Sequence, residues 1–309
     1  MLGPIVRPPC ARTLADAIRR FASSTGQSTA TINFNNDTQD ALVNSLIKQE
    51  LVRSPRVEAV LRALDRRDFT STHMGIPAHV SYSDSQVPIG QGQSISAPSL
   101  HAICLGLLEG HVGPGAAVLD VGAGSGYLTA CFSLLVGPAG RVAALERHER
   151  LVEQAGWALA CSLSAHVGDM QPTHGSPGAQ ERDTHSSQPQ QLGSQGVQRT
   201  GVSSGGRLVV RLHNVEMYHG NVLDDAALEA VGACGPFHAI HVGAAAREVP
   251  GGLLALLRPG GRMVLPLGPP VAMQALTVID KAADGSISSS RVRDVKLPPL
   301  VPPNAERPL

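Results

Sequence analysis

The sequence is poor in aromatic residues, since Phe, Tyr and Trp together make up only 3% of its 309 residues. A platform of stacked rings for nucleic-acid bases or sugars is therefore not expected, and aliphatic side chains must fill the core. Neither charge is in excess, because 25 basic residues balance 25 acidic ones. This argues against general attraction to nucleic acid or to an anionic membrane. No apolar run approaches the roughly 20 residues that a membrane span needs.

Cysteine is also scarce and irregularly spaced. The sequence contains no CxxC pair and no spacing typical of metal ligands. An odd number of scattered thiols fits a reducing compartment. We therefore expect free cysteines, no metal site and a cytoplasmic protein. The five cysteines are Cys10, Cys104, Cys131, Cys161 and Cys234.

The first 36 residues differ in composition from the rest. They contain many Ser and Thr and only one acid, Asp16, against four arginines: Arg7, Arg12, Arg19 and Arg20. This is the composition of a transit peptide, which would place the protein in mitochondria. A disordered extension without a targeting function accounts for this composition equally well. Both interpretations stay open.

Helical periodicity begins after Asp37. Leu42 and Leu46 lie one turn apart, and Ser54-Pro55 predicts an N-cap followed by a first-turn proline. A stretch rich in turn residues follows until a helix begins near Pro98. We expect N-terminal helices and a ligand-binding loop over residues 37–110.

From residue 111 to 309 we expect one further domain. Short β-type runs, AAVLDVG, RVAALE, NVEMYHG, FHAIHVG and RMVLPLG, alternate there with helical segments. Strands that are apolar on both faces predict a mostly parallel sheet covered by helices on both sides, an α/β Rossmann-like fold. Residues 158–207 interrupt the pattern. They are rich in Gln, Ser, Gly and Pro, and we expect a disordered insertion there.

A glycine-rich loop follows the first of these strands. The run VLDVGAGSG places Asp120 before Gly122, Gly124 and Gly126, at the edge where open α/β sheets bind ligands. A dinucleotide loop reads GxGxxG, so here the third glycine comes one residue early. GxGxG after a strand-ending Asp, with Glu146 ending the second strand, favours S-adenosylmethionine as cofactor. An NAD-dependent oxidoreductase is the remote alternative.

Four runs resemble, in order, the protein-L-isoaspartate (D-aspartate) O-methyltransferase family. They are VPIGQGQSISAPSLHA, VLDVGAGSGYLTACFSLLVGPAGRV, AIHVGAAAREVP and LLRPGGRMVLPLGP, and the resemblance covers about residues 38–157 and 208–302. It implies methylation, by S-adenosylmethionine, of the free α-carboxylate of L-isoaspartyl residues, with D-aspartyl residues as a further substrate, in age-damaged proteins. The ester starts repair through a succinimide. Since no assembly motif is visible, we expect a monomer.

The same resemblance implies the site residues. Ser96 corresponds to the family's active-site serine, although its position also suits an N-cap for the helix near Pro98. Ala244, Ala245 and Ala246 would leave room for a substrate backbone, or else they serve close packing. The residues expected to bind cofactor are Gln93, Ser94, Ile95, Ser96, His101, Asp120, Gly122, Gly124, Ser125, Glu146, Arg147, Gly220 and Asn221.

Two departures from the family pattern affect the cofactor site. Glu146 stands where Asp is common. Asn221 and Val222 replace the last two residues of a Gly-Asp-Gly whose Asp lies near the adenine amino group, so a charge is lost. This loss motivates an alternative, a non-catalytic substrate-recognition or adaptor protein with the same fold. A methyltransferase for another carboxylate is a further alternative.

Overall fold

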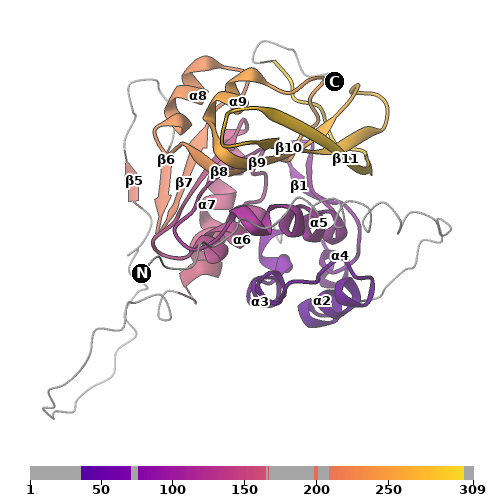
Figure 1. Cartoon of the computed structure of the whole chain (residues 1–309). Coiled ribbons are helices and arrows are strands. Elements are labelled where there is room, and N and C mark those ends of the chain that lie inside the picture. Colours follow the sequence, from indigo (N-terminus) through magenta and orange to yellow (C-terminus); the bar gives the residue numbers. More distant parts are fainter. Residues whose placement is uncertain (1–35, 71–75, 165, 167–197, 201–208, 303–309) are drawn as a thin grey trace, which may run out of the picture.

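The computed structural model describes residues 36–70, 76–164, 166, 198–200 and 209–302 of the chain (Figure 1). Nine strands of these residues form one sheet. The pairs in its centre, from β9 to β7, are parallel, and the pairs at both edges are antiparallel. The expected α/β fold is therefore confirmed. Across the sheet the strands are β11 (Ile287–Val295), β10 (Gln274–Lys281), β9 (Leu257–Leu267), β8 (Phe237–Val242), β3 (Ala117–Val121), β4 (Arg141–Glu146), β7 (Val215–His219), β6 (Val209–Leu212) and β5 (Gln198–Thr200).

The antiparallel edges follow from short connections. His213 and Asn214 alone join β6 to β7, and His213 takes φ 52°. Gly285, at φ 85°, lies in the turn between β10 and β11. Such turns bring successive strands together only in antiparallel order, whereas parallel neighbours need a longer crossover. The strand β11 ends at Val295, so the prolines that follow it do not interrupt its ladder with β10.

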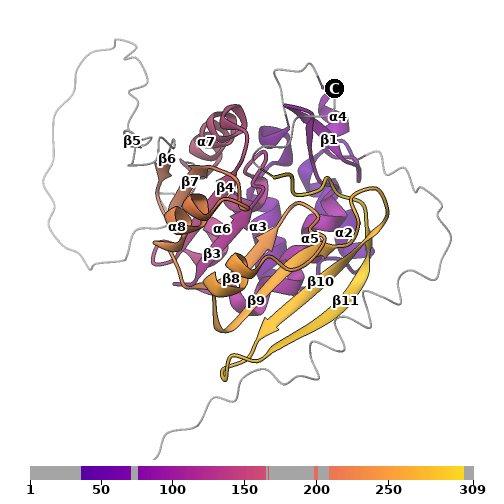
Figure 2. The same ribbon diagram turned by 90° about the horizontal axis from the view of Figure 1, so that it is seen from above.

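Helices cover both faces of the sheet (Figures 1 and 2). One face carries α8 (Asp225–Gly232) and α9 (Gly251–Leu256), and the other carries α5 (Pro98–Leu108), α6 (Tyr127–Val136) and α7 (Glu149–Ser164). The strands alternate between these layers. Leu119 of β3 belongs to the core under α8 and α9, whereas Val118 belongs to the core under α5, α6 and α7. Asp120, two residues after Val118, therefore also lies on the second face.

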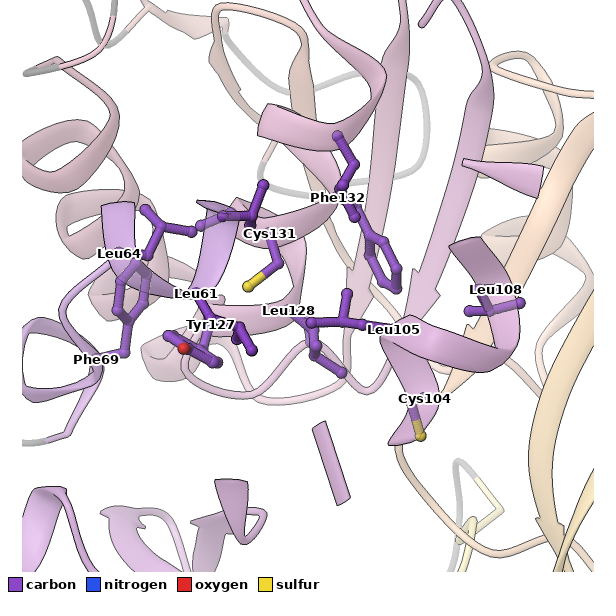
Figure 3. Packing of buried hydrophobic residues seen from close by; sticks show 14 of the residues in the cluster. Leu61, Leu64, Phe69, Cys104, Leu105, Leu108, Tyr127, Leu128, Cys131 and Phe132 are labelled. Carbon is purple, nitrogen blue, oxygen red and sulfur yellow. The ribbon is translucent and has the colours of Figure 1, made fainter. Parts of the chain in front are cut away.

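The N-terminal helices form as their sequence predicts. The helices α2 (Gln39–Lys48) and α3 (Pro55–Ala63) lie against α5 and α6, outside the sheet. The Ser54 hydroxyl caps α3 by accepting from the N–H groups of Arg56 and Val57, and Pro55 occupies the first turn. Figure 3 shows side chains of α6 packed between those of α3 and α5. This packing fixes the start of α6, and with it the glycine loop.

Shorter elements connect these helices to the sheet. They are the 3-10 helices η2 (Arg66–Phe69) and η4 (Glu109–His111), the helix α4 (Ala78–Ser81) and a hairpin of β1 (Val87–Gly90) with β2 (Gln93–Ile95). Among the described residues, the helices are all too short or too polar to cross a membrane. Four of the five cysteines are described, and all four are free thiols: Cys104, Cys131, Cys161 and Cys234.

Two boundaries expected from composition are wrong. The insertion does not begin at residue 158, because α7 continues to Ser164 and buries Leu159 and Leu163. The strand β5 also lies inside the range assigned to the insertion. The N-terminal extension ends before Asn36, whose buried side chain donates to the carbonyl of Tyr82. The rest of both segments, residues 1–35, 165, 167–197 and 201–207, lies outside the described residues.

Candidate functional site

The candidate site lies where the strand order changes direction. The chain passes from β3 outward to β4 and β7, then returns to place β8 on the other side of β3. Open α/β sheets bind ligands at such a switch point, beyond the carboxyl ends of the strands. Asp120 near the end of β3 pairs in register with His241 near the end of β8. Both side chains therefore reach the crevice on the face covered by α5, α6 and α7.

Asp120 and His241 form a buried pair. The imidazole Nδ1 lies 2.8 Å from Asp120 Oδ1, and the Thr129 hydroxyl donates to Oδ2 at 2.6 Å. Asp120 is 1% exposed and His241 is 7% exposed. Burial alone would lower the pKa of His241, but its interactions with Asp120 and with Cys104 raise that pKa to about 10. We therefore assign His241 as an imidazolium at neutral pH, whose charge Asp120 balances.

The glycine loop turns from β3 into α6 with a backbone that other residues rarely adopt. Gly126 has φ 83°, and a Cβ added there would lie 3.1 Å from Ala155 Cβ on α7. Gly243, after β8, approaches the loop from the other side, since a Cβ there would lie 3.0 Å from the Gly122 carbonyl oxygen. Glycine is thus needed both for conformation and for close approach. The loop exposes bare backbone to the crevice.

Glu146 braces this loop from β4. Its Oε2 accepts from the Gly124 N–H at 3.0 Å, and its Oε1 accepts from the His148 N–H at 2.9 Å. Burial raises the pKa of Glu146, and those two N–H groups oppose the rise. Each carboxylate oxygen keeps a further lone pair. Glutamate in place of aspartate therefore reaches the loop and can still accept from ribose hydroxyls.

One small pocket gathers half of the residues expected in the site. It is lined by Ser94, Ile95, Ser96, His101, Asp120, Gly122, Gly124 and Ser125. Five further residues line it that sequence reasoning did not assign: Ala123, Tyr127, Leu128, His241 and Gly243. The loop, the hairpin β1–β2 and the start of α5 thus meet at one place. His101, 7% exposed, places its ring 5.3 Å from that of Tyr127.

Ser96 lines this pocket and does not cap α5. The N-cap of α5 is Ala97, which makes no side-chain cap. Asp84 takes this role from another segment, since its Oδ1 accepts from the Ser99 N–H at 2.8 Å. The interpretation of Ser96 as a cap is therefore wrong, because a serine one residue too early cannot reach the first free N–H groups. The Ser96 side chain is therefore available to a ligand in the pocket.

Three other expected cofactor residues lie around the pocket rather than in its lining. Gln93 turns back to the Gln91 carbonyl at 3.5 Å. Arg147 directs its Nε toward His148 at 3.1 Å. Gly220 follows β7, and its N–H donates to the Glu146 carbonyl. Arg147 and Gly220 directly follow β4 and β7, whereas Gln93 begins β2.

Asn221 holds the C-terminal segment, residues 297–302. Its Nδ2 donates to the Val301 carbonyl at 2.7 Å, and its Oδ1 accepts from the Leu223 N–H at 3.0 Å. The same segment bridges Ala245, whose N–H donates to Pro298 and whose carbonyl accepts from Leu300. An aspartate at position 221 has no N–H to donate. The amide at position 221 therefore has a structural use that the family's carboxylate would not have.

The three alanines expected on the substrate side differ in their exposure. Ala245 is 3% exposed and Ala246 is 5% exposed, and both form backbone bridges, to Pro299 and Leu267 respectively. Only Ala244 is partly exposed. Close packing thus accounts for Ala245 and Ala246, and the packing partner is the C-terminal segment and β9 rather than a helix.

The chain matches known proteins along most of its length. The family model described as protein-L-isoaspartate (D-aspartate) O-methyltransferase matches residues 36–185 and 214–305. A protein-L-isoaspartate O-methyltransferase of Triticum aestivum is 37% identical over 87% of this chain and 94% of its own length. The chain belongs to this family. Protein-L-isoaspartate O-methyltransferase 2 of Arabidopsis thaliana is 36% identical over 92% of this chain and 71% of its own length.

A solved structure shares the fold of this family member. It is a Plasmodium falciparum protein described as a protein-L-isoaspartate O-methyltransferase, in complex with S-adenosyl-L-homocysteine. Its TM-score is 0.63 at 24% identity, covering 86% of this chain and 99% of that chain. The family is S-adenosylmethionine-dependent, as its sequence motifs predict. The adaptor alternative is not favoured.

The residues present fit that cofactor. The glycine loop leaves its backbone open at the pocket, and a Cβ added at Gly122 would meet no protein atom closer than 3.8 Å. Glu146 lies behind this loop, where its free lone pairs suit ribose hydroxyls, and Asp120 supplies a carboxylate for an amino group. When bound, S-adenosylmethionine supplies an electrophilic methyl group on a sulfonium.

His241 was not predicted as a site residue, although it lies in the predicted strand FHAIHVG. The run FHAIHVG is typical of a strand, and the alternation of side chains along it places Ala239 and His241 on one common face. The missing information was the neighbour of this strand. Once β8 lies beside β3, a histidine near the strand end must meet Asp120.

Replacing Asn221 with Asp is expected to loosen residues 297–302. The carboxylate keeps the bond from Leu223 but sets an oxygen against the Val301 carbonyl, so we expect a loss of about 1–2 kcal/mol. Hydrogen exchange at the Leu300 amide should accelerate about 5- to 30-fold, which corresponds to that loss. Asn44→Asp is the matched control, because among the described residues the Asn44 side chain bonds only through its acceptor oxygen, toward Arg62. Unchanged exchange at Leu300 would mean that Asn221 does not hold the segment.

Proposed function

We propose that this protein transfers the methyl group of S-adenosylmethionine to the free α-carboxylate of L-isoaspartyl residues in damaged proteins. D-aspartyl residues are proposed as a second substrate. The observation that carries the proposal is the position of Ser96, which lines one pocket together with the glycine loop and His101. Family membership supports the same reaction. The resulting ester would start repair through a succinimide.

The pocket suits a nucleophile that needs no general base. A carboxylate with a pKa near 4 is ionised at neutral pH, so the reaction requires alignment and exclusion of water rather than proton transfer. S-adenosylmethionine held by the glycine loop, Asp120 and Glu146 would supply the methyl group to one carboxylate oxygen, and its sulfur would keep the electron pair of the broken carbon–sulfur bond. The Ser96 hydroxyl can donate to the other oxygen without quenching the nucleophile by charge.

The Asp120–His241 pair fixes the geometry of the cofactor site and takes no part in acid–base chemistry. His241 retains its proton because Asp120 balances its charge. Asp120 in turn is fixed by Thr129 and still has free lone pairs for a cofactor amino group. The pair thus presents an acceptor toward the cofactor without adding a net charge to the crevice.

Replacing Ser96 with Ala is expected to lower kcat/KM for an isoaspartyl peptide by about 10- to 100-fold, because a hydrogen bond to a charged group contributes roughly 1.5–3 kcal/mol. The measurement is transfer of labelled methyl from S-adenosylmethionine, with the matching aspartyl peptide as substrate control. Ser99→Ala is the variant control, because Ser99 lies outside the pocket lining. Equal labelling of both peptides would overturn the proposed function. If Ser96→Ala and Ser99→Ala were equally active, Ser96 would have no role in the proposed reaction.

A further inference from the structure

Arg66 is a fully buried cation beside the pocket. Its Nε donates to the Ser81 carbonyl at 2.9 Å, and its Nη2 donates to the Ser85 carbonyl at 3.4 Å. None of the ion pairs formed by the described residues includes Arg66. Burial lowers the pKa of Arg66 to about 10, which still leaves it charged at neutral pH. The charge of Asp84 opposes this drop only in part. Because a buried cation without an ion-pair partner is costly, a further role is expected.

The third nitrogen of this guanidinium, Nη1, faces His101. Arg66 Nη1 lies 3.5 Å from His101 Nδ1. A guanidinium has only donors, so the ring nitrogen that faces it must present a lone pair. Burial first, and then the Arg66 charge, lower the pKa of His101 well below its ordinary value. His101 is therefore a neutral imidazole whose single proton is on Nε2.

The opposite side of this ring belongs to the pocket. His101 lines the pocket together with Ser96 and the glycine loop, while its Nδ1 is directed at Arg66. An Nε2–H donor there attracts an anion, whereas the other tautomer would present a lone pair and repel it. Two carboxylates come to this pocket in the proposed reaction, one on the cofactor and one on the substrate.

We propose that Arg66 is a positioning residue that fixes His101 in the Nε2–H tautomer, so that the imidazole donates a hydrogen bond to a ligand carboxylate. This inference rests on the proposed function, which supplies the carboxylates. Arg66 never touches the ligand and acts through the ring. Arg66 lies 35 residues before His101 in the sequence, and only the tertiary fold brings the two side chains together.

A purely structural role for Arg66 must be separated from this one. The carbonyls of Ser81 and Ser85, which Arg66 holds, flank Asp84, and Asp84 receives the Ser99 N–H at the start of α5. Loss of Arg66 therefore disturbs the helix that carries His101 as well as the ring itself. The tautomer of His101 separates the two roles, because a change in the stability of α5 alone does not determine it.

The test is long-range ¹H–¹⁵N NMR of the full chain labelled at histidine, with His101→Gln to assign the ring. Wild type and Arg66→Lys, which still donates, should show an unprotonated Nδ1 and a protonated Nε2. Folded Arg66→Met should show both nitrogens at averaged shifts, because no donor selects a tautomer. A wild-type tautomer in folded Arg66→Met would overturn the proposal. So would an Nδ1–H tautomer in wild type, even if the Met variant fails to fold.

Ligand addition then identifies the carboxylate. If S-adenosylhomocysteine alone shifts the wild-type Nε2–H signal, the cofactor carboxylate is the acceptor, and Arg66→Met should raise the KM for S-adenosylmethionine about tenfold or more. If only the isoaspartyl peptide shifts it, the KM for peptide should rise instead. In either case Arg66→Lys should keep the KM close to that of wild type. Binding of both ligands without a shift would overturn the assigned hydrogen bond. Absence of isoaspartyl methylation by wild type would contradict the proposed function and leave the tautomer result standing.

Discussion

Replacing Asp120 with Ala is expected to lower the free energy of unfolding by about 3–5 kcal/mol, because removal of one partner leaves the other charge buried without compensation. His241 would lose its partner at 2.8 Å, and Thr129 would lose its acceptor at 2.6 Å. Both residues of the ion pair are buried, so water cannot replace the lost contacts without opening the crevice. The imidazolium must then give up its proton or disrupt the packing under α6.

Equilibrium urea denaturation at pH 7 checks this expectation. Thr129→Val is the matched control, since it removes only the hydroxyl bond to Asp120 and should cost about 1 kcal/mol. Asp120→Asn tests charge separately from shape, because the amide keeps the size of the carboxylate but cannot balance an imidazolium. Equal costs for Asp120→Ala and Thr129→Val would contradict a charged pair.

Alkaline pH is expected to weaken the protein through His241. The pKa of His241 is about 10 in the folded protein, against roughly 6.5 in an unfolded chain. The folded state therefore binds the proton more tightly. This stabilisation is fully present below about pH 6.5 and is lost as pH rises through about 10. The slope between these limits should reach about 1.4 kcal/mol per pH unit.

The measurement is the free energy of unfolding of wild type and His241→Asn at intervals from pH 6 to pH 10. Arg66 also has a folded pKa of about 10, and its effect is common to both proteins. The difference between the two curves isolates His241. We expect wild type to exceed the variant most at pH 6 and the two curves to converge toward pH 10. Parallel curves would show that His241 is a neutral imidazole, and not an imidazolium, in the folded protein.

Much of the architecture was predictable from local patterns. Apolar runs such as AAVLDVG and RVAALE became β3 and β4 at the expected positions, and Ser54-Pro55 opened α3. These features depend on residues within one turn or one strand. The glycine loop was predictable for the same reason, since Gly126 meets a positive φ that its neighbours in the chain already require.

Composition was a weaker guide than periodicity. Residues 158–164 look polar because they contain Cys161, Ser162 and Ser164, yet Leu159 and Leu163 lie four residues apart and continue the buried face of α7. Spacing, not average polarity, decides whether a helix face can be buried. The predicted start of the insertion failed on this point.

The sequence by itself determined the strands, the first helices, the glycine loop and the family. Only the tertiary structure decided the partners of the site residues. Asp120 meets His241 across 121 positions, and Asn221 meets Val301 across 80. Periodicity tells which side of an element is buried, but not which distant element covers it. That choice depends on the order of strands and the packing of helices, where segments remote in the chain become neighbours.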